Sequence, residues 1–292
     1  MIERIFKLYQ HLLVRDIVKT TTWSTVGKAG GLLVPYFIAA WFGVCDETDA
    51  FFFVYGVILF LSGIFAQVVE TVIVPYAAEA RAKDEDVGKF VGNILCVSGV
   101  GLFVVVGLLI LVIKPILSII TRFDEQSLSL IFKLLIESAP LIIPLVWTSV
   151  LIGALNTYKK FAFPAMSPAF RAAVNLIIIL TFKDICGIHS IAFGYVLGEF
   201  ARLAILFAVI KKLNLFKLRF SFQIDHKLAG FFKTASYQIL GMTVIGLNPF
   251  IDKTMASWLG HASVSVLHYA NILYMIPVTF LLGGLTVTLI SY

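Results

Sequence analysis

The 292-residue sequence carries little charge: 14% of its residues are Asp, Glu, Lys or Arg, and 60% are hydrophobic. A soluble domain has about 25% charged residues because water must solvate its surface. The low charge therefore excludes an ordinary soluble protein. Uncharged runs such as residues 94–113 are long enough to cross a bilayer core of about 30 Å, and similar runs recur along the whole chain. A signal peptide ahead of a soluble domain would not produce this pattern.

Cysteine is scarce, and no common enzyme motif is present. Cys45, Cys96 and Cys186 are too few for a disulfide framework; free thiols are expected, with one Cys45–Cys186 bridge as the alternative. There is no His-Glu-x-x-His zinc motif, Gly-x-Ser-x-Gly elbow or Walker loop. His261 and His268 flank the last polar joint and are expected to be solvated at the interface. We therefore expect a protein that is not an enzyme. A membrane glycosyl transferase would also need larger outer loops.

Hydropathy and helix breakers predict an all-α, polytopic membrane bundle of about eight transmembrane helices. The predicted spans are 20–44, 49–77, 88–113, 128–157, 160–182, 188–212, 228–259 and 264–292. Residues 1–19 alternate apolar and charged side chains at helical spacing. They predict an amphipathic helix in the interface, with a plain cytoplasmic lead-in as the alternative.

Lysine and arginine are distributed unevenly between the two sets of joints. Fifteen lie on the N-terminal side: Arg4, Lys7, Arg15, Lys19, Arg81, Lys83, Lys89, Lys159, Lys160, Lys211, Lys212, Lys217, Arg219, Lys227 and Lys233. Only Lys114, Arg122 and Lys183 lie on the other. The positive-inside rule then predicts a cytoplasmic N-terminus. Anionic lipid headgroups explain the net charge of +6 without nucleic acid.

A weak internal repeat predicts two lobes. Pro35-Tyr36-Phe37-Ile38, Trp41 and Tyr55 in the first copy are matched weakly by Pro249-Phe250-Ile251, Trp258 and Tyr269 in the second. Chance similarity between apolar helices is the alternative. A true repeat would give a complete six-helix lobe over 20–227 and the first two helices of a second lobe over 228–292. Many transporters hold their substrate between two such bundles. A second polypeptide could complete the second lobe.

Charged residues inside the spans are candidates for function, because each costs about 2.5–3.5 kcal/mol at a helix centre. Two pairs share a helix face by spacing, Glu199 with Arg202 and Lys133 with Glu137. Arg171 and Glu70 lie near predicted helix ends, where they could reach the interface.

Lys28 and Asp252 have no such simple explanation. Lys28 lies among Gly27, Gly30 and Gly31 without an acidic residue within four positions. It predicts either a cavity that receives an anionic group or a lysine that reaches the cytoplasmic edge. Asp252 and Lys253 follow Pro249, which should bend its helix and create a moving part or an ion site. Pro140, Pro144, Pro164 and Pro168 also predict bent helices around a cavity.

Short motifs spread along the chain resemble the MurJ/MviN family, in the same order. They are Thr48-Asp49-Ala50-Phe51-Phe52 after Phe42-Gly43, Ile64-Phe65-Ala66, Val74-Pro75, Gly153-Ala154-Leu155-Asn156-Thr157, Phe163-Pro164-Ala165, Ser167-Pro168, Ile251-Asp252, Ala256-Ser257, Ser263-Val264-Ser265 and Tyr269-Ala270-Asn271. The resemblance implies an inverted-V bundle of the multidrug/oligosaccharidyl-lipid/polysaccharide exporter superfamily. It also implies a flippase that moves lipid II, the undecaprenyl-pyrophosphate-linked peptidoglycan precursor, across the bacterial inner membrane by alternating access. Family members typically have two six-helix lobes plus two further helices, so the resemblance implies a chain that stops after helix eight.

The resemblance also suggests site residues. Lys28 stands where the family has an arginine, whereas Val34, Ser62 and Ile272 stand at further arginine positions and Asn271 replaces an acidic residue. The predicted substrate-binding residues are Lys28, Asp49, Arg171, Glu199, Arg202, Lys253 and Asn271. Asp252 is the predicted sodium ligand, with the membrane potential as another coupling source, and no other cofactor is expected. Alternatives are an exopolysaccharide or O-antigen flippase, a cation-coupled drug exporter that uses Glu70 or Glu137, and a truncated, non-transporting remnant.

Overall fold

The computed structural model describes residues 22–23, 25–27, 29–223 and 225–282, and the regular structure within them is helical. After a first span, Thr25–Phe42, the elements are α2 (Asp46–Ala82), α3 (Val87–Ile120), α4 (Glu125–Ser138), η1 (Ala139–Leu141), α5 (Ile142–Thr157), α6 (Ala162–Cys186), α7 (His189–Lys212), α8 (His226–Ala256) and α9 (Ser263–Leu282). The predicted interfacial helix at 1–19 and the predicted anion contact Lys28 lie outside the described residues.

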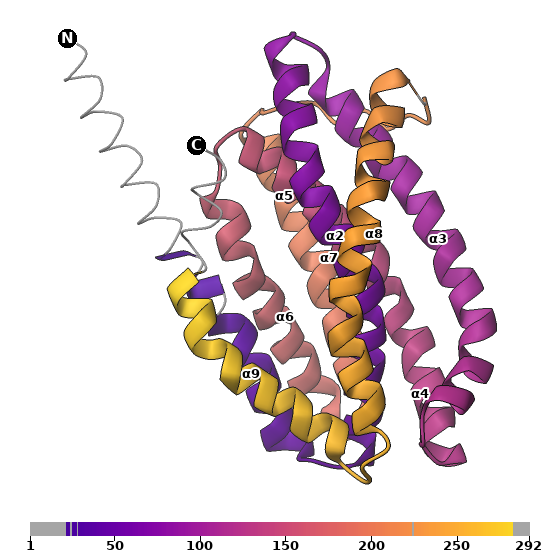
Figure 1. Cartoon of the computed structure of the whole chain (residues 1–292). Coiled ribbons are helices and arrows are strands. Elements are labelled where there is room, and N and C mark those ends of the chain that lie inside the picture. The colour runs from indigo at the N-terminus through magenta and orange to yellow at the C-terminus, as the bar shows by residue number, and fades with distance from the viewer. Residues whose placement is uncertain (1–21, 24, 28, 224, 283–292) are drawn as a thin grey trace.

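Successive spans run in opposite directions, with α4 and α5 following each other in one direction, which places the joints 83–86, 158–161 and 213–223 at one end of the bundle (Figure 1). Within the described part, six spans are long and apolar enough to cross a membrane, counting Glu125–Thr157 as one. α8 and α9 pack beside them. The predicted all-α membrane bundle of eight helices is confirmed. At about 55 Å, the 37-residue α2 is longer than the bilayer core.

Three helices begin at an aspartate that satisfies a free backbone N–H. Asp86 accepts from Lys89 N at 3.0 Å at the start of α3, and Asp124 accepts from Ser127 N at 3.3 Å at the start of α4. Asp225 accepts from Leu228 N at 2.7 Å at the start of α8. Such caps fix where a helix starts because its first turn has no internal acceptors.

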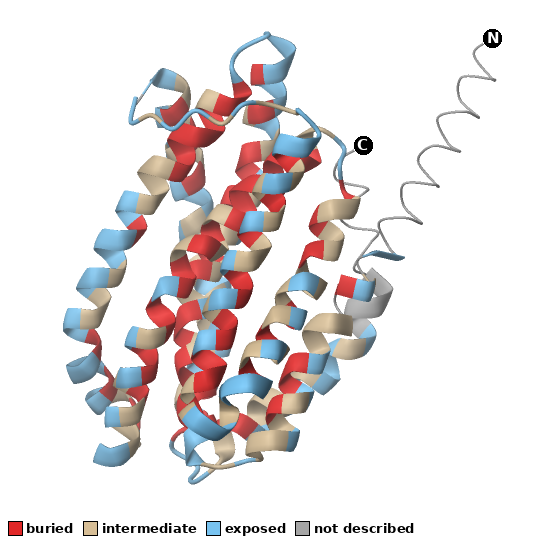
Figure 2. Cartoon of the chain, turned by 180° about the vertical axis from the view of Figure 1, so that it is seen from behind, coloured by how far each residue is buried: buried red, intermediate tan, exposed pale blue. Residues whose placement is uncertain are grey.

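α2 lies at the centre of the bundle and packs against α4, α5 and α8, with α9 crossing its start. Phe51, Phe52 and Phe53 are fully buried on consecutive positions, so α2 is enclosed on all sides there. Gly153 of α5 has no room for a side chain because Ile73 of α2 lies against it. α3 stands at the edge of the bundle; its start is buried, whereas most of residues 100–120 are exposed (Figures 1 and 2).

The bend predicted in the fourth span is present. A short 3₁₀ turn, η1, separates α4 from α5, and Pro140 lies in it. Proline removes an N–H donor and its ring clashes with the preceding turn, so the regular helix stops there. Pro168 and Pro249 lie inside α6 and α8, which both continue past them.

Residues 213–223, which we call the strap, connect the end of α7 toward α8. Arg219 N donates to Gly88 O at 3.3 Å, and Asn93 Nδ2 donates to Gln223 O at 3.0 Å. Gly88 and Gly92 of α3 leave no room for a Cβ because the carbonyls of Lys217 and Arg219 lie against them. The strap is therefore held closely on the start of α3.

Candidate functional site

A cluster of three charges lies between α6 and α7. Arg171 Nη1 contacts Glu199 Oε2 at 3.1 Å, and Arg202 Nη1 contacts Glu199 Oε1 at 3.3 Å. Arg202 Nε also donates to Ser167 Oγ at 2.9 Å. The Glu199 side chain is fully buried, and these three side chains together carry one net positive charge. Glu70 of α2 also lies within electrostatic reach of Arg202. The predicted Glu199–Arg202 pairing is confirmed, and Arg171 joins it instead of reaching the interface.

The cluster borders a cavity of about 170 Å³ between the first span, α2, α6, α7 and α9. Its walls come from five helices, through Gly31, Val34, Pro35, Tyr55, Arg171, Ala172, Asn175, Tyr195, His268 and Ile272. Arg171 is the one Asp, Glu, Lys or Arg among the described residues that line it. An anionic group would therefore meet an arginine that Glu199 holds in place.

Small residues bring these helices together. A Cβ on Gly27 or Gly30 would meet the backbone of α6, whereas Gly31 faces open space and lines the cavity. Gly198 of α7 leaves room for Asn175, whose amide nitrogen, when turned toward them, donates to Arg171 O at 3.0 Å and Gly194 O at 2.6 Å. Of the three glycines beside Lys28, Gly27 and Gly30 therefore allow the helices to pack closely, as predicted, whereas Gly31 leaves space for the cavity.

Aromatic rings form part of the cavity wall. The ring centroids of Tyr55 and Tyr195 are 4.7 Å apart, and those of Phe52 and His268 are 3.9 Å apart in a stack. His268 Nε2 is buried and has no hydrogen-bond partner within the described part of the chain. The expected interfacial solvation of His268 is therefore wrong, because stacking on Phe52 carries it into the cavity wall.

Asp49 of α2 lies beside the N-terminus of α9, and its side chain is buried. Its Oδ1 accepts from Ser265 N at 2.8 Å and Ser265 Oγ at 2.6 Å, while Oδ2 accepts from Val264 N at 3.3 Å. A carboxylate at a helix N-terminus satisfies free N–H groups and the helix dipole. Both oxygens are thus engaged in joining α2 to α9, and the predicted contact of Asp49 with substrate stays a prediction.

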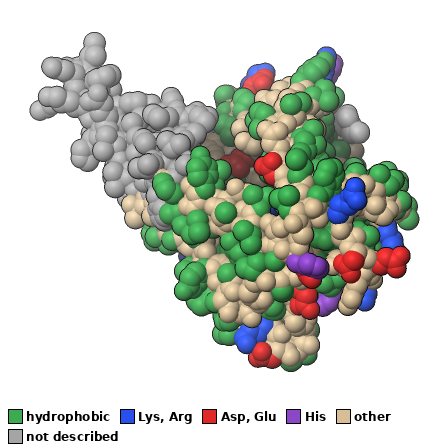
Figure 3. Space-filling model, turned by 60° about the horizontal axis from the view of Figure 1, so that its bottom comes forward, with side chains coloured by type: hydrophobic (Ala, Val, Ile, Leu, Met, Phe, Trp, Pro, Cys, Tyr) green, Lys and Arg blue, Asp and Glu red, His purple; other side chains and the backbone are tan. Residues whose placement is uncertain are grey.

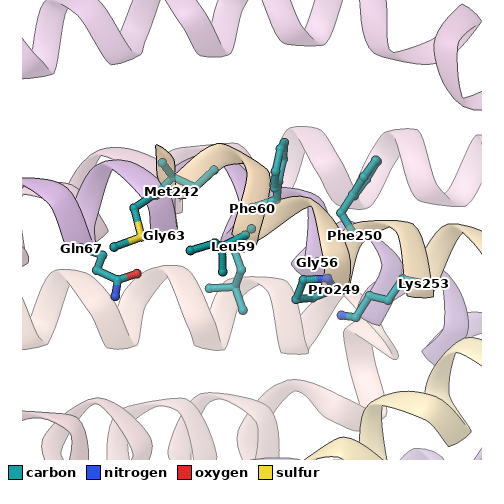
Figure 4. A pocket seen from close by; sticks show the side chains of 12 residues that line it. Gly56, Leu59, Phe60, Gly63, Gln67, Met242, Pro249, Phe250 and Lys253 are labelled. Carbon is teal, nitrogen blue, oxygen red and sulfur yellow. The ribbon is translucent and has the colours of Figure 1, made fainter. Parts of the chain in front are cut away.

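Lys253 of α8 reaches α2 and is only 8% exposed. Its Nζ donates to Phe52 O at 2.7 Å, and Gly56 makes room for it, because a Cβ there would lie 2.7 Å from Lys253 Cδ. Lys253 also closes one end of a groove of about 320 Å³ between α2 and α8 (Figure 4). Gln67 lies at the other end, with apolar side chains such as Phe60 between them.

Other predicted residues lie apart from this cavity. Asp252 and Asn271 are exposed on α8 and α9 and do not line it. Across the residues that the structure describes, no three His, Cys, Asp or Glu side chains are grouped to hold a metal, so sodium at Asp252 stays a prediction. Glu137 bonds to His189 at 2.7 Å, and the predicted partner Lys133 forms no ion pair with it.

The end of the bundle where α2 begins is closed by contacts between the two predicted lobes. His261 Nδ1 bonds to Asp46 Oδ1 at 2.9 Å, and Tyr269 Oη donates to Gly43 O at 3.4 Å. The hydrogen bond and the charge of Asp46 raise the pKa of His261 above its ordinary value. Acidic and histidine side chains gather at this end among hydrophobic ones (Figure 3).

Sequence reasoning did not identify Tyr55, Tyr195 and Asn175 as site residues. Nothing in their local sequence distinguishes them from other membrane-helix residues, because their role depends on how α2, α6 and α7 meet. The one available signal was Asn175 in an apolar segment, since a buried amide needs partners.

The family model described as "Lipid II flippase MurJ" matches residues 38–291. A probable lipid II flippase MurJ from Helicobacter pylori is 28% identical over 176 residues, covering 53% of this chain and 38% of that protein. The solved structure "Lipid II flippase MurJ, inward closed conformation" aligns with a TM-score of 0.72 and 22% identity, covering 90% of this chain and 55% of that one.

The Vibrio cholerae MATE transporter VcmN in its bent form has the same fold, with a TM-score of 0.71 and 15% identity, covering 96% of this chain and 65% of that one. The chain spans about half the length of the curated relatives it matches.

Proposed function

The chain belongs to the MurJ lipid II flippase family, whose members are transporters and not enzymes, and from this premise we propose that it binds and moves a polyprenyl-pyrophosphate-linked saccharide. The peptidoglycan precursor lipid II is the first substrate to test. Lipid-linked exopolysaccharide and O-antigen units carry the same pyrophosphate and are the second class.

The observation that supports this proposal most is the position of Arg171. Among the described residues that line the cavity, it is the one with a charged Asp, Glu, Lys or Arg side chain, and Glu199, which also pairs with Arg202, holds it there. A guanidinium binds phosphate oxygens through a planar pair of donors, whereas a drug cation would be repelled. The cavity is too small for a saccharide, so we propose that it takes the pyrophosphate. Lys28, Lys253 and Asn271 remain proposed contacts to other parts of the substrate.

We propose alternating access between two lobes, with 20–227 as the first and 228–292 as the start of the second. The cavity supports this mechanism because its walls include α9 as well as first-lobe helices. The Asp49 and His261 contacts close the end where α2 begins. The opposite end carries most of the described lysines and arginines. By the positive-inside rule we place that end in the cytoplasm of a bacterium, in the inner membrane.

Binding of undecaprenyl pyrophosphate to the purified chain in nanodiscs tests the proposal. We expect Arg171→Ala to weaken binding at least tenfold, Arg171→Lys to weaken it less, and Lys183→Ala to have no effect. Lys183 lies on the same helix and pairs with Asp184 outside the cavity. Equal binding by Arg171→Ala and the unaltered chain, with both well folded, would overturn the assignment.

Complementation in cells depleted of their own lipid II flippase then tests transport. We expect the chain, expressed with any further segment its gene encodes, to restore growth, and Arg171→Ala to fail at equal membrane abundance. Unchanged growth defects together with altered drug susceptibility would favour the drug exporter instead.

A further inference from the structure

A second cavity lies at the other end of α7, under the strap, and is separate from the Arg171 site. Its volume is about 480 Å³. It is lined by Phe207, Ile210 and Lys211 of α7 and by Phe216, Lys217 and Leu218 of the strap. Apolar side chains and two ammonium groups therefore meet in one hollow.

The two lysines of this cavity differ from other cations nearby. Arg219 pairs with Asp86 at 3.1 Å, and Lys227 pairs with Glu85. Lys211 and Lys217 form no ion pair with any carboxylate in the part of the chain that the structure describes. Their charge is therefore available to an external anion.

The cavity continues an apolar stripe along the outer face of α7. Phe193, Leu197 and Phe200 are 40%, 47% and 46% exposed and follow one another at helical spacing. Ala204 and Ala208 extend the exposed stripe to Lys211. A stripe of this length faces lipid chains in a membrane bundle, so a chain lying on it would bring its headgroup to the cavity.

The strap presents its side chains from a fixed backbone. Its hydrogen bonds to Gly88 and Asn93 hold it on α3, and the Phe216 ring packs on Tyr158 with centroids 5.6 Å apart. Phe220 and Phe222 are 61% and 66% exposed beside the basic residues. Exposed phenylalanines next to lysines and arginines are typical of segments that lie in the headgroup region of a membrane.

We propose that this cavity binds an anionic glycerophospholipid. Its phosphate contacts Lys211 and Lys217, and one acyl chain lies along the exposed stripe of α7. A soluble phosphate would use the lysines but not the stripe, and an acidic protein segment would leave the stripe uncovered. The combination of unpaired cations with a continuous apolar track specifies a lipid.

The test is retention of dioleoyl phosphatidylglycerol by the purified chain, measured by native mass spectrometry against dioleoyl phosphatidylcholine. We expect preferential retention of phosphatidylglycerol and a loss of about thirty-fold in its affinity for Lys211→Gln/Lys217→Gln, since each lysine near a membrane surface contributes about 1 kcal/mol. The control Lys160→Gln/Lys233→Gln makes the same charge change at the same end, at exposed positions outside the cavity. It should retain the lipid.

Three results would overturn the proposal. The first is equal loss in both double variants, which would indicate a diffuse electrostatic effect. The second is equal retention of the two lipids by the unaltered chain. The third is that sn-glycerol 3-phosphate protects the chain against thermal unfolding as well as phosphatidylglycerol does, which would indicate a site for soluble anions. Substitutions of exposed lysines leave the core intact, so each variant should fold.

Discussion

Two groups of charges lie inside this bundle and are neutralised in different ways. Between α6 and α7, the side chains of Arg171, Glu199 and Arg202 pair with one another, and the three together carry one net positive charge beside a cavity. Asp49 and Lys253 instead bind backbone groups of another helix: Asp49 of α2 accepts from α9, and Lys253 of α8 donates to α2. The two groups therefore serve different purposes. The cluster has charge left to bind a ligand, whereas Asp49 and Lys253 hold α9 and α8 on α2.

The largest expected effect comes from removing the acid at the centre of the cluster. Glu199→Gln leaves two arginines close together in a buried position, which should lower the free energy of unfolding by about 3–5 kcal/mol. Unfolding in detergent, followed by circular dichroism, measures it. Glu79→Gln is the control because Glu79 pairs with Lys83 on an exposed surface. A loss no larger than that of the control would show that the cluster does not stabilise the lobe.

The second largest effect is expected from the contact between Asp49 and the start of α9. Asp49→Ala removes the acceptor for two backbone N–H groups and one hydroxyl of α9, which should cost about 2–3 kcal/mol. The loss should be local, so we expect faster protease cleavage in 257–262 while the first lobe stays resistant. Glu47→Ala, an exposed change in the same helical turn, is the control. Unchanged cleavage in 257–262 would mean that other contacts hold α9.

The contact between Lys253 and α2 can be tested without substituting a charged residue. Gly56→Ala places a methyl group against the flexible end of the Lys253 side chain, which must shift away from Phe52 O. Losing that hydrogen bond, offset in part by the better helix propensity of alanine, should destabilise the α2–α8 contact by about 1 kcal/mol. Gly63→Ala, two turns away with nothing within 4 Å, should be neutral or stabilising. Disulfide crosslinking between cysteines placed on α2 and α8 measures the contact. Identical crosslinking in the two variants would argue against a fixed position for Lys253.

The smallest effect belongs to the exposed His261–Asp46 pair. Because the pKa of His261 is raised in the folded protein, the contact stabilises below the ordinary histidine pKa of 6.5. That contribution disappears as the pH rises through the higher folded pKa. The unaltered chain should therefore have a slightly higher Tm than His261→Ala near pH 5, and the two should coincide near pH 9. A constant difference across this range would exclude the ionised contact as its source.

The sequence predicted the fold well because membrane insertion imposes a strong pattern. Long apolar runs and polar joints located the spans to within several residues, and Pro140 marked a real break in the fourth span. The i,i+3 spacing of Glu199 and Arg202 also predicted their contact, since it places both side chains on one face of α7.

Contacts between distant segments could not be read in this way. Arg171 of α6 forms an ion pair with Glu199 of α7, and Glu137 contacts His189 of another helix instead of Lys133, one turn before it. Asp49 caps a helix that begins more than 200 residues later. Each depends on how helices are placed beside one another, which depends on packing around glycines such as Gly198 and not on periodicity.

Because the strap is held on α3, the start of α8 is fixed more firmly than its far end, so the helix could pivot about its start. The end near His226 is fastened by the strap and by Lys227 on Glu85, whereas Lys253 lies about 40 Å further along the helix. A tilt of about ten degrees around the fastened end would move Lys253 sideways by about 7 Å. Small rotations at the basic end of the bundle would thus break the lysine contact with Phe52 and open the far end.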